Sequence, residues 1–89
     1  MDVKKKILMN REKIKEIVIG FLIEELEIEE NKISDEALLK DDLGIESLDF
    51  VDIVVIVERN FGFKIKPEEM SDIKTVAQFL DYIESKVAE

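Results

Sequence analysis

Apolar residues recur at helical spacing in three separate segments, and this pattern restricts the possible folds more than any other feature. The segments begin at Ile14, at Ser47 and after Thr75. Spacings of three and four residues put apolar side chains on one face of a helix, which another element must cover. A chain of 89 residues is the size of one domain. The sequence therefore predicts a single all-α domain with one small core.

Residue types at the helix ends give approximate limits for the first two helices. Asn10 is of the type that caps a helix N-terminus, so the first helix should follow it. The second helix should begin at Ser47 and end near Phe61, because Gly62 is a stop signal. Gly20 interrupts the first helix, where it either permits close packing or costs about 1 kcal/mol relative to alanine.

Two further helices follow in the last third of the chain. Pro67 suits the first turn of a short helix, which should extend through about Ser71. Thr75 and Gln78 have the spacing of a capping box, so a longer helix should begin after Thr75. The expected apolar face of this last helix comprises Val76, Phe79, Leu80, Ile83 and Val87.

The segment between the first two long helices, residues 27–44, has no long helical period. Ser34 is placed to cap a short helical turn through Leu39. Otherwise the segment is a long connection, and connections of this length are often functional. Its apolar residues are expected to attach it to the core: Ile28, Ile33, Leu38, Leu39 and Leu43.

The charge is strongly negative and concentrated in one stretch. The chain has 22 acids and 13 bases, a formal net charge of −9. The stretch from Glu24 to Asp52 has twelve acids against Lys32 and Lys40, which gives −10. Such a protein lacks the basic patch that nucleic acid requires, so we expect partners with basic surfaces. The alternative is a solvated face that only keeps the protein soluble.

Missing residue types exclude several kinds of chemistry. Cysteine and histidine are both absent, so the chain has no thiol, no disulfide and no histidine base or metal ligand. The calcium-loop pattern also fails, because Gly44 at its sixth position puts Leu39 where an aspartate is required. We therefore expect no metal site and no enzymatic activity of the chain's own.

The apolar runs of the sequence are short. None approaches the ~20 residues of a membrane span. The apolar residues after Lys6, from Ile7 to Met9, are too few for the core of a signal peptide. A cytoplasmic location is therefore expected.

The most specific segment runs from Asp42 to Asp49, with the sequence Asp-Leu-Gly-Ile-Glu-Ser-Leu-Asp. Gly44 permits a tight turn, and Ser47 then stands at the start of a helix. The helix dipole and unpaired backbone N–H groups favour a phosphate ester at that place. The alternative is that Ser47 is an ordinary N-cap, although Phe50 at the third helical position would then complete no capping box.

This segment resembles the signature of the acyl carrier protein family, whose usual core is Leu-Gly-x-Asp-Ser-Leu, and the likeness extends from about Ile14 to Ile83. The resemblance implies a four-helix bundle with three longer helices, one short helix and a long loop between helices one and two. The carrier domain would span residues 11–89, after an N-terminal extension of residues 1–10. Ser47 would bear 4′-phosphopantetheine, taken from coenzyme A. Several positions depart from the family pattern: Glu46 replaces an aspartate, Glu27 stands where many members have glycine, and Phe50 and Phe79 occupy positions that are often smaller.

The resemblance further implies a monomeric phosphoprotein that carries acyl intermediates as thioesters in fatty-acid, specialised lipid or polyketide biosynthesis. Its partners would be a phosphopantetheinyl transferase and acyl-transferring and chain-elongating enzymes with basic surfaces. Peptidyl and D-alanyl carrier proteins share the serine and are one alternative. An acidic helical interaction module without a prosthetic group is the other.

Two sets of residues are candidates for contacts around Ser47. The first set should dock partner enzymes, with acids beside an apolar strip on the second helix: Glu46, Leu48, Asp49, Val51, Asp52, Val55 and Glu58. We expect Asp49 and Asp52 to affect binding more than folding. Leu48, Val51 and Val55 would otherwise be core, but Ile53, Val54, Val57 and Phe61 offer a better inward stripe.

The second set should lie where an acyl cavity opens, as the resemblance implies. Its members are Leu39, Phe50 and Phe79. The two phenylalanines are larger than the residues common at these positions, so they should narrow the cavity.

Overall fold

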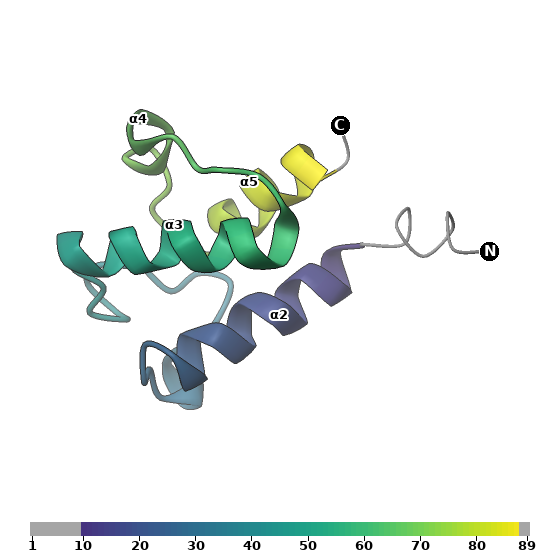
Figure 1. Cartoon of the computed structure of the whole chain (residues 1–89). Helices are drawn as coiled ribbons and strands as arrows, with labels where there is room; N and C mark the ends of the chain where they lie inside the picture. The colour runs from purple at the N-terminus through teal and green to yellow at the C-terminus, as the bar shows by residue number, and fades with distance from the viewer. Residues whose placement is uncertain (1–9, 88–89) are drawn as a thin grey trace.

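The computed structural model describes residues 10–87, which contain four α-helices and one short 3₁₀ turn. These elements are α2 (Arg11–Glu24), η1 (Glu30–Lys32), α3 (Ser47–Phe61), α4 (Pro67–Met70) and α5 (Val76–Val87). In Figure 1, α2 and α3 run in opposite directions, and the chain after α3 turns back to α4 before entering α5. The prediction of an all-α four-helix bundle with a long first connection is confirmed. Residues 1–9 lie outside the described residues, so the N-terminal extension stays a prediction.

The helices end where the local signals predicted. The Asn10 side chain accepts a hydrogen bond of 2.9 Å from the backbone N–H three residues later. Gly62 ends α3 with φ of +82°, the left-handed conformation that glycine adopts at little cost. Thr75 Oγ1 accepts from Gln78 N–H at 3.1 Å, and Gln78 Oε1 accepts from Thr75 N–H at 3.2 Å. The predicted capping box of α5 is therefore formed.

The three long helices supply most of the core. On α2 the buried residues are Ile14, Val18, Phe21 and Leu22, and on α5 they are Val76, Phe79, Leu80 and Ile83. On α3 they are Ile53, Ile56 and Val57. The predicted inward stripe of α3 was thus partly wrong, since Val54 and Phe61 are only half-buried and Ile56 replaces them. Steps of three and four from Ile53 lead to Ile56 and Val57, and this face belongs to the same core cluster as the buried residues of α2 and α5. No helix within residues 10–87 has the length and apolarity to cross a membrane.

The long connection between α2 and α3 is held by backbone pairing with the segment before α5. Leu39 N–H donates to Lys74 O at 2.9 Å, and Val76 N–H donates to Ala37 O at 3.0 Å. Leu38 and Thr75 form an isolated antiparallel bridge. Of the two alternatives for this segment, the long connection is therefore the observed one: Ala37 N–H closes a single turn on Ser34 O at 3.1 Å, and the backbone that follows pairs with a distant segment.

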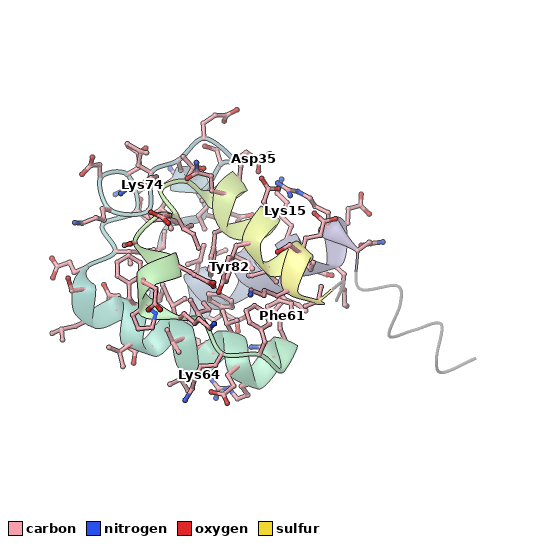
Figure 2. All side chains as sticks on the ribbon, turned by 90° about the horizontal axis from the view of Figure 1, so that it is seen from above. Lys15, Asp35, Phe61, Lys64, Lys74 and Tyr82 are labelled. Carbon is pink, nitrogen blue, oxygen red and sulfur yellow. The ribbon has the colours of Figure 1, made fainter. Side chains whose placement is uncertain are left out.

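The side chains of the connection also attach it to the bundle. Ile28, Leu39 and Leu43 are buried as predicted, whereas Ile33 is half-buried and Leu38 is 38% exposed. The Lys15 ammonium of α2 lies 3.3 Å from the Asp35 carboxylate of the connection, and Figure 2 labels both residues. The loop is therefore a fixed part of the fold, anchored on two sides.

Glu27, at the start of this connection, has φ of +57°, so a glutamate adopts here the left-handed conformation that glycine favours. The expected departure from the family pattern therefore falls at a place where the backbone itself favours glycine.

Replacing Gly20 with alanine should raise the free energy of unfolding by about 0.5–1 kcal/mol. A Cβ at this position would meet nothing within 4 Å, so Gly20 does not serve close packing. The gain should appear in thermal melting as a rise of at least about 2 °C, given that 1 kcal/mol shifts Tm by about 4–8 °C in a domain of this size. Gly62→Ala, at positive φ, should lower Tm in the same assay. Equal losses in both variants would show that Gly20 is needed for packing.

Candidate functional site

Ser47 occupies the first position of α3, and its side chain is exposed. Gly44, three residues earlier, has φ of +73°, as the tight turn before the helix requires. Ile45, between them, is buried and fixes the entry of the chain into α3. The sequence thus presents the Ser47 hydroxyl on a fixed helix end.

The N-cap of α3 is Glu46, so the reading of Ser47 as an ordinary cap is wrong. Asp49, at the third helical position, accepts a hydrogen bond from Glu46 N–H at 2.9 Å. Within residues 10–87 the Ser47 hydroxyl forms no hydrogen bond with a protein group. Capping-box spacing counted from Glu46 instead of Ser47 would have given this arrangement. Ser47 is therefore left free for another role.

Backbone N–H groups beside the Ser47 hydroxyl can also donate hydrogen bonds to a ligand. Asp49 and Phe50 donate to the Glu46 carbonyl, at 2.9 and 3.3 Å. Ser47 and Leu48 donate to no protein acceptor within the described part of the chain. With the positive end of the helix dipole, these two N–H groups form a local environment that favours a phosphate oxygen.

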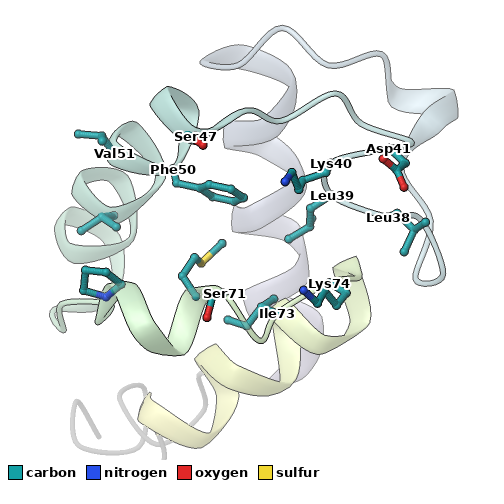
Figure 3. A pocket seen from close by; sticks show the side chains of 13 residues that line it. Leu38, Leu39, Lys40, Asp41, Ser47, Phe50, Val51, Ser71, Ile73 and Lys74 are labelled. Atoms are coloured by element: carbon teal, nitrogen blue, oxygen red, sulfur yellow. The ribbon is translucent and has the colours of Figure 1, made fainter.

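A pocket of about 730 Å³ opens beside Ser47 (Figure 3). It lies between the connection before α3, the first turns of α3, α4 and the segment that leads into α5. Leu39 and Phe50 line it, as predicted for an acyl cavity, and Phe50 is half-buried at its wall. Phe79 does not line it: this side chain is only 1% exposed and belongs to the central core. Phe79 shares the buried face of α5 with Val76, Leu80 and Ile83.

Most of the residues that line this pocket were not among the predicted cavity residues. Met70 and Ile73 form its far wall, and Lys40 and Lys74 stand at its rim. No local pattern marks them, because the pairing of residues 37–39 with residues 74–76 brings these positions together across the fold.

The outward face of α3 carries the predicted docking strip. Leu48, Val51 and Val55 are 82%, 61% and 56% exposed, so the alternative that they are core is wrong. Of the acids, Asp49 is half-buried and the others are exposed: Glu46, Asp52 and Glu58. Single exposed apolar residues are common, but three in one strip are not, and their role in docking stays a prediction.

Hydrogen bonding and an ion pair link α4, one wall of the pocket, to α5. Tyr82 Oη donates to the Glu69 carboxylate, and Lys86 Nζ lies 3.9 Å from the same carboxylate. Burial and the hydrogen bond to Glu69 raise the pKa of Tyr82 to about 12. The hydrogen bond from Tyr82 lowers the pKa of Glu69. These contacts hold the short helix against the bundle, although four residues are too few for a helix to be stable alone.

A comparison with known protein families identifies the family of this chain. Residues 16–83, most of the chain, match the model of the family described as phosphopantetheine attachment site. The chain belongs to the phosphopantetheine attachment site family. A 4′-phosphopantetheine group is therefore its cofactor, covalently attached.

Curated relatives of this family cover nearly the whole described domain. An acyl carrier protein of Thermotoga maritima is 40% identical over 78 residues, which is 88% of this chain and 96% of the relative. An acyl carrier protein of Thermosynechococcus vestitus is 38% identical over 80 residues, 90% of this chain and 99% of the relative. One of Coprothermobacter proteolyticus is 40% identical over 79 residues, 89% of this chain and 96% of the relative.

Proposed function

We propose that this protein is an acyl carrier protein whose 4′-phosphopantetheine arm is attached to Ser47. The observation that carries the proposal is the free, exposed Ser47 hydroxyl at the first position of α3, beside an apolar pocket. The hydroxyl caps no helix, and two unpaired N–H groups lie next to it. These features fit a phosphodiester, which needs an accessible oxygen and nearby donors.

Attachment is a phosphoryl transfer from coenzyme A. Ser47 Oγ forms a bond to the phosphorus that bears the pantetheine, the bond to the nucleotide breaks, and adenosine 3′,5′-bisphosphate leaves. The hydroxyl proton goes to a base of the transferase, since the chain has no histidine to accept it. Once attached, the arm supplies a terminal thiol that holds an acyl group as a thioester. We propose no catalytic step by this protein itself.

The pocket beside Ser47 suits the acyl group. Apolar side chains of Leu39, Phe50 and Met70 line it and can shield a chain from water. Its mouth lies at Ser47, so an arm that folds back would bring its cargo to the pocket. An apolar lining supports the acyl reading over the peptidyl and D-alanyl alternatives, whose cargo carries an ammonium group.

Partner enzymes would dock on the outward face of α3, where exposed apolar side chains are flanked by acids. These partners are a phosphopantetheinyl transferase and enzymes of fatty-acid or related lipid biosynthesis that carry basic surfaces. Charge would guide the approach and apolar contact would hold the complex. A monomeric state and a cytoplasmic location stay predictions.

The test is attachment followed by a thiol count. The protein is incubated with coenzyme A and a phosphopantetheinyl transferase, and its intact mass is measured. Because the chain has no cysteine, a thiol reagent can label only the attached arm. We expect one added phosphopantetheine and one new thiol per chain. A mass gain without a thiol, or no gain with several transferases, would contradict the proposal.

Replacing Asp52 with lysine should weaken binding to the transferase several-fold and leave stability within about 0.5 kcal/mol, because Asp52 is exposed and forms no ion pair within residues 10–87. The loss should shrink as salt rises, since exposed charges are screened beyond ~10 Å at moderate ionic strength. Binding is measured by titration and stability by thermal melting.

Asp49→Lys is compared with Asp52→Lys to distinguish an effect on stability from an effect on binding. This residue accepts a hydrogen bond from Glu46 N–H, so its loss should also lower stability by about 1 kcal/mol. The expectation that both acids affect binding more than folding therefore applies more clearly to Asp52 than to Asp49, which accepts this hydrogen bond. If Asp52→Lys binds as tightly as the parent, the acidic face does not guide this partner.

A further inference from the structure

The rim of the pocket beside Ser47 contains two lysines in the most acidic part of the protein. Lys40 is one of only two bases between Glu24 and Asp52, and Lys74 lies across the pocket wall from it. The hydrogen bond of 2.9 Å from Leu39 N–H to Lys74 O fixes the two backbones side by side. In Figure 3 the ammonium ends of both side chains lie toward the interior of the pocket.

Neither lysine is paired with an acid in the part of the chain that the structure describes. Asp41 and Asp42 directly follow Lys40 in the sequence. Asp42 is engaged elsewhere, because its carboxylate accepts from Leu38 N–H at 2.8 Å. Asp41 also lines this pocket, but in Figure 3 its carboxylate lies away from the two ammonium groups, which can therefore donate hydrogen bonds to a ligand.

An alkyl chain gains nothing from these charges, whereas an anionic group would form charge-assisted hydrogen bonds with them. We propose that Lys40 and Lys74 bind a carboxylate at the far end of the cargo, so that this carrier prefers acyl groups derived from dicarboxylic acids. The apolar wall of Leu39, Phe50 and Met70 would hold the methylene groups, and the lysines would hold the terminal carboxylate. This inference rests on the proposed attachment at Ser47.

The test compares two cargoes of equal carbon number, hexanoyl and adipoyl, which differ only in the terminal carboxylate. Each is loaded from its coenzyme A thioester by a phosphopantetheinyl transferase, and Tm is measured at low salt. In the parent protein we expect the adipoyl form to melt higher by about 4 °C or more, the scale of one charge-assisted hydrogen bond in a domain of this size. In the Lys40→Gln/Lys74→Gln variant this preference should vanish.

Lys64→Gln is the control for loss of a lysine charge away from the pocket. It removes one positive charge from an exposed lysine that Figure 2 shows well separated from Lys74, and the adipoyl preference should persist in it. Equal melting of the two cargoes in the parent would overturn the inference, as would a preference that survives in the double variant. A loss that is the same for both cargoes and for the bare arm would mean that the lysines bind the phosphate of the arm. A chain that takes no arm at all would contradict the proposed function and this inference with it.

Discussion

Ser47→Ala should take up no phosphopantetheine, while the parent protein is modified to completion. The alanine variant lacks the only atom that could form the phosphodiester at this site. Its fold should be unchanged, because the hydroxyl is exposed, caps no helix and forms no hydrogen bond with residues 10–87. We therefore expect a complete loss of both the mass increase and the new thiol, with a Tm within about 2 °C of the parent.

The control for this experiment is Ser71→Ala. Ser71 also lines the pocket and is exposed at the end of α4, but its hydroxyl donates to the Glu68 carbonyl at 2.8 Å. This variant should be modified as fully as the parent. Modification of Ser47→Ala at the parental rate would mean that another hydroxyl is the acceptor, and peptide mapping of the product would identify it.

Phe79→Ala should cost much more stability than Phe50→Ala, and only the second loss should be recovered by a long acyl chain. Phe79 is 1% exposed in the central core, so its removal leaves a closed void and costs about 3–5 kcal/mol. That is a large part of the 5–15 kcal/mol by which small domains are typically stable, so Phe79→Ala should be partly unfolded at 37 °C. Phe50 is half-buried and faces the pocket, so its loss should be smaller.

The length of the attached acyl chain should distinguish the Phe50→Ala variant from the Phe79→Ala variant. With dodecanoyl attached instead of acetyl, Phe50→Ala should gain more Tm than the parent does, because the longer chain fills the space that the ring left. Phe79→Ala should gain no more than the parent, because its void does not open into the pocket. If dodecanoyl stabilises the parent as much as Phe50→Ala, the pocket is already wide enough and Phe50 does not narrow it.

The helices could be predicted from the sequence because their causes are local. The periodic apolar residues of α2 and α5, the Thr75–Gln78 box and the stop at Gly62 act within one or two turns. The connection before α3 could not be predicted in the same way. Its conformation depends on hydrogen bonds between residues 37–39 and 74–76, which are far apart in the chain. Local signals at Ser34 were compatible with a helical turn through Leu39, and only the distant partners decide for the extended connection.

The residues of the candidate site also differ in whether local sequence could predict their roles. Ser47 and the exposed strip on α3 follow from a motif and a helix, so the sequence located them. Asp49 was assigned to docking alone, since its hydrogen bond to Glu46 N–H depends on which residue is the N-cap. Phe79 was assigned to the cavity, but the rotation of α5 about its axis turns it into the core. Nothing in the local sequence marked Lys40 and Lys74, because only the fold brings them to one rim of the pocket.

The near-ultraviolet signal of Tyr82 can report on the protein without an added label. Tyr82 is the only tyrosine and the chain has no tryptophan, so the near-ultraviolet phenol signal comes from one place, the contact between α5 and the pocket wall formed by α4. While Glu69 accepts the hydrogen bond from Tyr82, the pKa of Tyr82 stays at about 12. If a bulky cargo pushes α4 aside, this hydrogen bond should break and the surroundings of the phenol should change. Near-ultraviolet circular dichroism at neutral pH, where the thioester is stable, would then reveal, without any label, which cargoes displace this wall.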